Sequence, residues 1–175
     1  MKLCLIVYYS RTEVTAKVAT ALAQLCGADL ERIHDVIPRD GAAGFVRSAW
    51  QALRGKPGAI APPQRHPADY PIIVLGTPVW AGQMSAPMRS YILHQREHFR
   101  RVGLFCTIGG GDGQDVLSEM ADMCNKLPVA SLILQHGEVL SGQYTQPLAD
   151  FANELAIFQN DERAHASSHT LAHPA

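Results

Sequence analysis

The stretch that decides the fold is LCLIVYY at residues 3–9, which continues without a spacer into SRTEVT at residues 10–15. Its first half is apolar and rich in strand-forming residues, as expected for a strand buried on both faces of a parallel sheet. Its second half carries several hydroxyls and leads into residues 16–25, where apolar residues recur at helical spacing. In a parallel α/β sheet such a loop lies at the carboxyl end of its strand. Helix N–H groups and hydroxyls at that end can receive an anion such as phosphate.

Strand-like and helix-like patterns alternate along the rest of the chain. We expect further strands at residues 30–36, 70–76, 101–107 and 129–134. We expect helices at residues 45–53, 85–94, 116–127 and 148–158, with Gly27 ending the first helix and Ser85 capping the third. This alternation predicts an α/β fold with a doubly wound, five-stranded parallel sheet and helices on both faces. Residues 159–175 have no apolar period, so we expect one domain at 1–158 and a disordered tail at 159–175.

Composition narrows the class of protein. The 175 residues, 47% of them hydrophobic and 18% charged, are enough for one domain with a full core. A net charge of -1 gives no general attraction to nucleic acid or to an anionic membrane. The apolar run at residues 3–9 is too short to span a bilayer, and charged residues follow it without a cleavage site. We therefore expect a cytoplasmic protein with no membrane insertion.

The four cysteines are widely spaced and form no CxxC pair. In a reducing compartment such cysteines behave as small hydrophobic residues. We therefore expect neither disulfides nor a metal site.

Three loops follow strands one, three and four of the predicted sheet, at residues 10–15, 77–83 and 107–114. In a sheet ordered 2-1-3-4-5 these loops meet at one edge, at the switch point between strands one and three. Flavodoxin is a known example of this geometry, with FMN in that crevice.

The loop sequences themselves resemble those of the flavodoxin superfamily. YSRTEVT at residues 9–15 is similar to the family's phosphate loop, usually written (S/T)-x-T-G-x-T. GTPVWAG at residues 76–82 resembles the second, flavin-contacting loop, and TIGGG at residues 107–111 resembles the third. The three loops occur in the family's order, and the likeness covers about residues 1–158.

The resemblance implies an FMN site made by all three loops, with the phosphate over the first loop and the flat ring system between the other two. Trp80 is the expected stacking partner, and the glycines allow the backbone to approach the ring. The implied cofactor-binding residues are Ser10, Arg11, Thr12, Glu13, Val14 and Thr15 of the first loop, Thr77, Pro78, Val79, Trp80, Ala81 and Gly82 of the second, and Thr107, Ile108, Gly109, Gly110 and Gly111 of the third.

The first loop departs from the family pattern at two positions. Glu13 stands where the pattern has Gly, and Val14 replaces the common Asn. If that Gly adopts a positive φ, Glu there costs on the order of 1 kcal/mol. The Glu13 carboxylate would also repel a phosphate unless it points to solvent or pairs with Arg11 or Lys17.

No set of side chains indicates covalent or acid–base catalysis, so the flavin would carry the chemistry. Three functions remain open. The first is an FMN-dependent oxidoreductase that takes electrons from NAD(P)H and reduces a quinone or a similar acceptor. The Thr-Pro-x-Trp loop resembles that of flavodoxin-like quinone or flavin reductases, and this resemblance favours the first function slightly. The second is a one-electron carrier serving a redox partner protein, although such flavodoxins are strongly acidic and this chain is nearly neutral. The third is a flavin-free binding or scaffold module with the same fold. The sequence leaves oligomerisation open.

Overall fold

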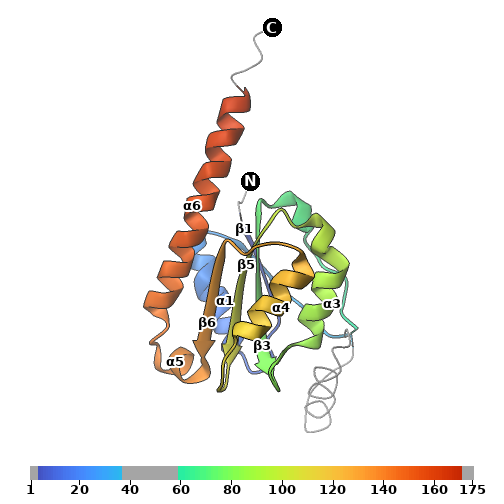
Figure 1. Cartoon of the computed structure of the whole chain (residues 1–175), viewed down its shortest axis with the longest axis vertical. Coiled ribbons are helices and arrows are strands. Elements are labelled where there is room, and N and C mark those ends of the chain that lie inside the picture. The colour runs from blue at the N-terminus through green and yellow to red at the C-terminus, as the bar shows by residue number, and fades with distance from the viewer. Residues whose placement is uncertain (1–3, 37–58, 171–175) are drawn as a thin grey trace.

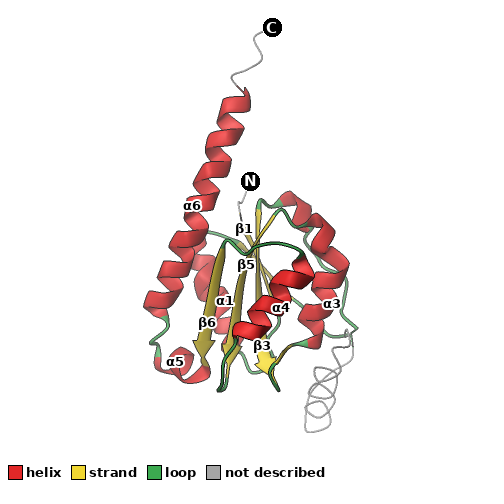
Figure 2. Cartoon of the chain, in the orientation of Figure 1, coloured by secondary structure: helices red, strands yellow, loops and turns green. Residues whose placement is uncertain are grey.

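The central feature of the computed structural model is a parallel sheet between two layers of helices (Figures 1 and 2). The structure describes residues 4–36 and 59–170. The five parallel strands, in the order β2-β1-β3-β5-β6, are β2 (Asp29–Arg32), β1 (Cys4–Tyr8), β3 (Ile72–Trp80), β5 (Arg101–Ile108) and β6 (Ala130–Gln135). A short strand, β4 (Gln83–Met84), pairs antiparallel with the end of β3. The predicted fold class is confirmed. The predicted strand order 2-1-3-4-5 is also confirmed, because β5 and β6 are the fourth and fifth parallel strands and β4 is an additional short strand.

The helices cover the two faces of the sheet in separate groups. One face carries α1 (Val14–Cys26), α5 (His136–Ser141) and α6 (Thr145–Thr170), and the other carries α3 (Ala86–Gln95) and α4 (Gln114–Cys124). Single turns of 3₁₀ helix lie at Pro67–Asp69 and Arg96–His98.

Successive side chains of β1 point to opposite faces of the sheet and pack into two separate cores. Leu5 and Val7 lie in the core under α3 and α4, whereas Cys4 and Ile6 lie in the core under α1 and α6. All four side chains are at most 1% exposed. This is why the first strand has no polar side and reads as a continuous apolar run.

Two predicted helix boundaries are present in the structure. Gly27 follows α1 with φ 58°, and its N–H donates to the carbonyl oxygen of Ala23, as in a left-handed C-cap. Ser85 precedes α3, and its hydroxyl accepts a hydrogen bond from the N–H of Met88 at 3.4 Å.

Other predicted boundaries differ from the structure. The strand expected at residues 30–36 is four residues long in β2, and a single bridge between Asp35 and Ile60 follows it. The helix expected at residues 45–53 lies outside the described residues.

The last helix is longer than the expected 148–158. It begins at Thr145 and continues to Thr170, so residues 159–170, expected to be disordered, are helical. Glu162, Arg163 and Ala164 are good helix formers and can extend an existing helix without an apolar face. Figure 1 shows this end of α6 extending away from the sheet.

Candidate functional site

The first loop turns the chain from β1 into α1 through a left-handed residue. Tyr9 still belongs to the sheet edge, since its N–H donates to the carbonyl oxygen of Gly76 at 3.0 Å. Glu13 is the N-cap of α1 and has φ 63°, and its carbonyl accepts the first helical bond, from Lys17 N–H, at 2.9 Å. The backbone here therefore has the positive φ anticipated for a Gly position. Glu pays a conformational cost of about 1 kcal/mol there.

Backbone donors gather inside this turn. Ser10 is buried, and its hydroxyl oxygen accepts a hydrogen bond from the N–H of Ala16 at 3.2 Å. The N–H groups of Val14 and Thr15, at the start of α1, have no acceptor within the helix because of helix geometry. The helix dipole adds partial positive charge at the same end. The turn is therefore suited to an anion.

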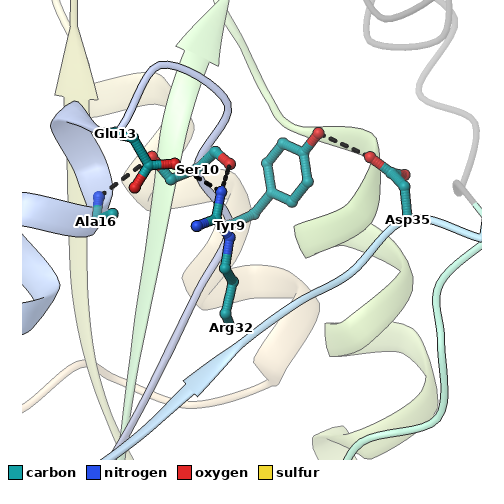
Figure 3. A network of polar contacts seen from close by, with 6 residues as sticks. All are labelled: Tyr9, Ser10, Glu13, Ala16, Arg32 and Asp35. Atoms are coloured by element: carbon teal, nitrogen blue, oxygen red, sulfur yellow. Dashed lines mark hydrogen bonds and ion pairs between the residues drawn. The ribbon is translucent and has the colours of Figure 1, made fainter. Parts of the chain in front are cut away.

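Arg32, the last residue of β2, spans the turn (Figure 3). Its Nη2 lies 2.7 Å from Glu13 Oε1 and donates to the carbonyl oxygen of Ser10 at 3.0 Å. The sequence suggested Lys17 or Arg11 as partners of Glu13, but the Lys17 ammonium donates to the carbonyl oxygen of Val139 at 3.1 Å. Sequence reasoning missed Arg32. The register that places Arg32 opposite Tyr8 brings it to the loop.

The second loop is a tight hairpin, because β3 runs on to Trp80 and pairs it with Gln83 of β4. The two central residues, Ala81 and Gly82, have φ 49° and 72°, as in the two-residue turns that suit twisted hairpins. Trp80 is half-buried, and its ring meets that of Tyr9 edge to face, with centroids 5.8 Å apart and planes at 87°. Tyr9 in turn donates to Asp35 Oδ2 at 2.7 Å (Figure 3). Trp80 is thus held beside the first loop with part of its surface exposed.

Thr77 and Pro78 lie behind this hairpin rather than on its surface. Thr77 is fully buried, and its hydroxyl accepts from Ser85 N–H at 3.1 Å and lies 3.0 Å from Ser85 Oγ. Val79 is half-buried and packs against the core under α3 and α4. The Thr77 side chain therefore fastens the end of β3 to the start of α3.

Replacing Thr77 with valine should lower the free energy of unfolding by about 1–3 kcal/mol, because the buried Ser85 N–H loses its acceptor. Thr77→Ser keeps the hydroxyl and should cost clearly less. Urea denaturation of both variants checks this expectation. Equal losses in the two variants would mean that the hydroxyl does not hold the turn.

The third loop begins beneath the first. Thr107 is fully buried, and its hydroxyl lies 2.8 Å from the hydroxyl of Thr15 in α1. Ile108 is also buried, whereas Gly109, Gly110 and Gly111 are exposed. Gly111 has φ 84°, while a Cβ on Gly110 would meet no atom within 4 Å. The packing of the described residues therefore does not require glycine at 110.

The three buried thiols offer no nucleophile. Cys4 and Cys106 are buried in strands, and burial raises the pKa of each thiol to about 12. Burial likewise raises the pKa of Cys124 to about 12. These thiols stay protonated and unreactive near neutral pH.

This architecture matches that of a known protein family. The flavodoxin family model matches residues 3–155. The chain belongs to the flavodoxin family. No curated protein matches the chain.

Several solved structures share the fold. A flavoprotein from Lactobacillus acidophilus NCFM, determined in complex with FMN, superposes with a TM-score of 0.65 at 20% identity, over 81% of this chain and 98% of that one. A WrbA-like flavodoxin from Agrobacterium tumefaciens gives 0.52 at 16% identity, over 87% and 96%. Rubredoxin oxygen:oxidoreductase from Desulfovibrio gigas gives 0.56 at 15% identity, over 94% of this chain and 37% of that one.

The described residues lack two features that would indicate other kinds of function. None of the helices there is both long and apolar enough to cross a membrane. The same part of the chain contains no group of three or more His, Cys, Asp or Glu side chains placed to hold a metal ion.

Proposed function

We propose that the chain is an FMN-binding flavoprotein that passes electrons from NADH or NADPH to a quinone or a similar acceptor. The observation that carries the proposal is the meeting of three features at one edge of the sheet. They are the N-terminus of α1, the indole of Trp80 and the exposed glycines at 109–111. The Thr15–Thr107 hydrogen bond and the Tyr9–Trp80 ring contact tie the three loops together.

The first loop fits the phosphate of FMN. The N–H groups of Val14 and Thr15 point out of the start of α1, and Thr12 is exposed in the same turn. The Ser10 oxygen accepts from the Ala16 N–H, so its own proton remains to be donated.

The second and third loops fit a flat aromatic ring. Trp80 offers a partly exposed indole on one side, and the open space beside Gly110 lets the backbone approach on the other. Thr77 holds the second loop from behind and would contribute no side-chain contact. When bound, FMN supplies hydride acceptance and the transfer of electrons, while the protein sets its position and surroundings.

Two observations favour an oxidoreductase over a simple carrier. The net charge of -1 gives the chain no strong negative field to guide it to a basic partner protein. One solved structure that shares the fold is an oxygen:oxidoreductase by name, and this chain matches 37% of its length. Acceptor and electron donor are then small molecules that must reach the exposed side of the ring.

FMN titration followed by a turnover assay tests the proposal. FMN fluorescence should be quenched on binding, and the loaded protein should oxidise NADH or NADPH with a soluble benzoquinone as acceptor. Quenching without nicotinamide oxidation would favour the electron carrier. A protein that neither quenches nor retains FMN would defeat both flavin functions and leave a binding or scaffold module.

Trp80→Ala should weaken FMN binding about 10-fold, as expected for the loss of one stacking contact. Trp80→Phe keeps an aromatic ring, so its loss of FMN affinity should be clearly smaller. Fluorescence titration measures both, with thermal melting to show that each variant is folded. Unchanged affinity in a folded Trp80→Ala protein would remove Trp80 from the site.

A further inference from the structure

We propose that Arg32 is the cation of the phosphate site and that Glu13 is its exchangeable partner, which the phosphate of FMN displaces. The inference rests on the proposed function, since it concerns the same loop. It assigns a role to the residue at which the chain departs from the family pattern, and to a residue of β2 that lies outside the three loops.

The position of Arg32 is fixed by the sheet. Arg32 pairs in register with Tyr8, the last residue of β1, so its side chain reaches the turn that begins two residues later. Its Nη2 donates to the Ser10 carbonyl oxygen at 3.0 Å, which anchors the guanidinium to the loop itself (Figure 3). This anchor does not depend on Glu13, so it can persist when the carboxylate leaves.

The contact between Arg32 and Glu13 is short but accessible. Nη2 and Oε1 are 2.7 Å apart, and the two side chains are 37% and 64% exposed. Exposed ion pairs contribute little net stability because water solvates both charges well. Replacing the Glu13 carboxylate by another anion as the partner of Arg32 therefore costs little free energy.

A phosphate is a better partner for this guanidinium than a carboxylate. It carries up to two negative charges and several acceptor oxygens, which match the planar donors of Arg. The partial positive charge at the start of α1 favours the same anion. Glu13, left beside the phosphate, would repel it, so loss of the Glu13 charge should strengthen phosphate binding.

Lys17, the other cation that was considered as a partner of Glu13 on α1, is directed elsewhere. Lys17, on the first turn of α1, donates to the Val139 carbonyl oxygen and lies over the Tyr144 ring at 5.6 Å from its centroid. The Tyr8 hydroxyl neighbours Arg32, but burial raises its pKa, so it stays neutral. Arg32 is thus a cation that the structure holds across the turn through two contacts, with Glu13 and with the Ser10 carbonyl.

The test compares FMN with riboflavin, which has the same ring and sugar chain but no phosphate. Arg32→Met should weaken FMN about 10-fold, the scale of one charge-assisted hydrogen bond, and leave riboflavin affinity unchanged. Glu13→Gln should tighten FMN about 3-fold, because a repelling charge beside the phosphate is gone, and again spare riboflavin. Arg65→Met is the matched control, since Arg65 pairs with Asp29 at the opposite end of β2, and it should alter neither affinity.

Inorganic phosphate gives a second readout that needs no flavin. It should raise the melting temperature of the parent protein and not that of Arg32→Met. The inference is overturned if Arg32→Met weakens both flavins equally or neither, or if Glu13→Gln weakens FMN. If the parent protein and Arg32→Met bind FMN with the same affinity, the role of Arg32 is overturned and the proposed function stands. A parent protein that binds neither flavin would defeat the proposed function, and the role of Arg32 with it.

Discussion

Gly76→Ala is expected to lower the free energy of unfolding by about 3 kcal/mol. Gly76 lies in β3 directly opposite Phe105 of β5, and a Cβ at this position would overlap the Phe105 ring. Phe105 is fully buried, so the ring cannot turn into solvent. Urea denaturation, with the unfolding midpoint and slope both fitted, measures the loss.

Two variants separate this clash from a general effect of replacing glycine. Gly76→Ala combined with Phe105→Leu should recover part of the stability, because the smaller side chain makes room for the methyl group. Gly137→Ala, where a Cβ would meet no atom within 4 Å, should change stability by about 0.5 kcal/mol or less. If Gly76→Ala matched Gly137→Ala, close packing between β3 and β5 would be contradicted.

Arg89→Ala is expected to lower the free energy of unfolding by about 2–3 kcal/mol, because it leaves Glu119 without its partner in a partly buried ion pair. Arg89 of α3 is 8% exposed, and its Nη2 lies 2.6 Å from Glu119 Oε1 of α4. Its Nη1 also lies 3.5 Å from the sulfur of Met123. Removing the guanidinium would leave the Glu119 carboxylate partly buried without a counter-charge.

Arg89→Met should cost less than Arg89→Ala, since the methionine chain refills the space between α3 and α4. Arg96→Ala is the surface control: Arg96 pairs with the exposed Glu97 at 3.4 Å and should lose less than about 1 kcal/mol. Thermal and urea unfolding of the three variants give the comparison. Equal losses for Arg89→Ala and Arg96→Ala would show that burial of the Arg89–Glu119 pair contributes nothing.

The sheet could be predicted from sequence because its strands have strong local patterns. Leu5, Ile6 and Val7 are buried on both faces of β1, and that burial is what makes the run apolar without alternation. β4 and α5 were missed because they span two and six residues, too few for a period to emerge. The helical extension to Thr170 was missed because helices were predicted from apolar residues at helical spacing, and the sequence after residue 158 has no such pattern.

The candidate site was predictable only where a local motif defined it. The left-handed backbone at Glu13 was anticipated from the Gly of the family loop, because that conformation belongs to the turn itself. Arg32 could not be found in this way, since it lies 19 residues from Glu13 and reaches the loop only through the pairing of β1 with β2. The burial of Thr77 likewise depends on Ser85 and α3 packing behind the hairpin.

The most direct test of the central claim is an FMN titration followed by amide NMR on ¹⁵N-labelled protein. Binding at the three loops predicts that the largest shifts fall on residues 10–15, 79–82 and 109–111, with Arg32 moving as Glu13 is displaced. Shifts confined to another surface, such as the pocket bordered by Arg96, Asp122 and Asn125, would contradict the account. So would a spectrum that FMN leaves unchanged.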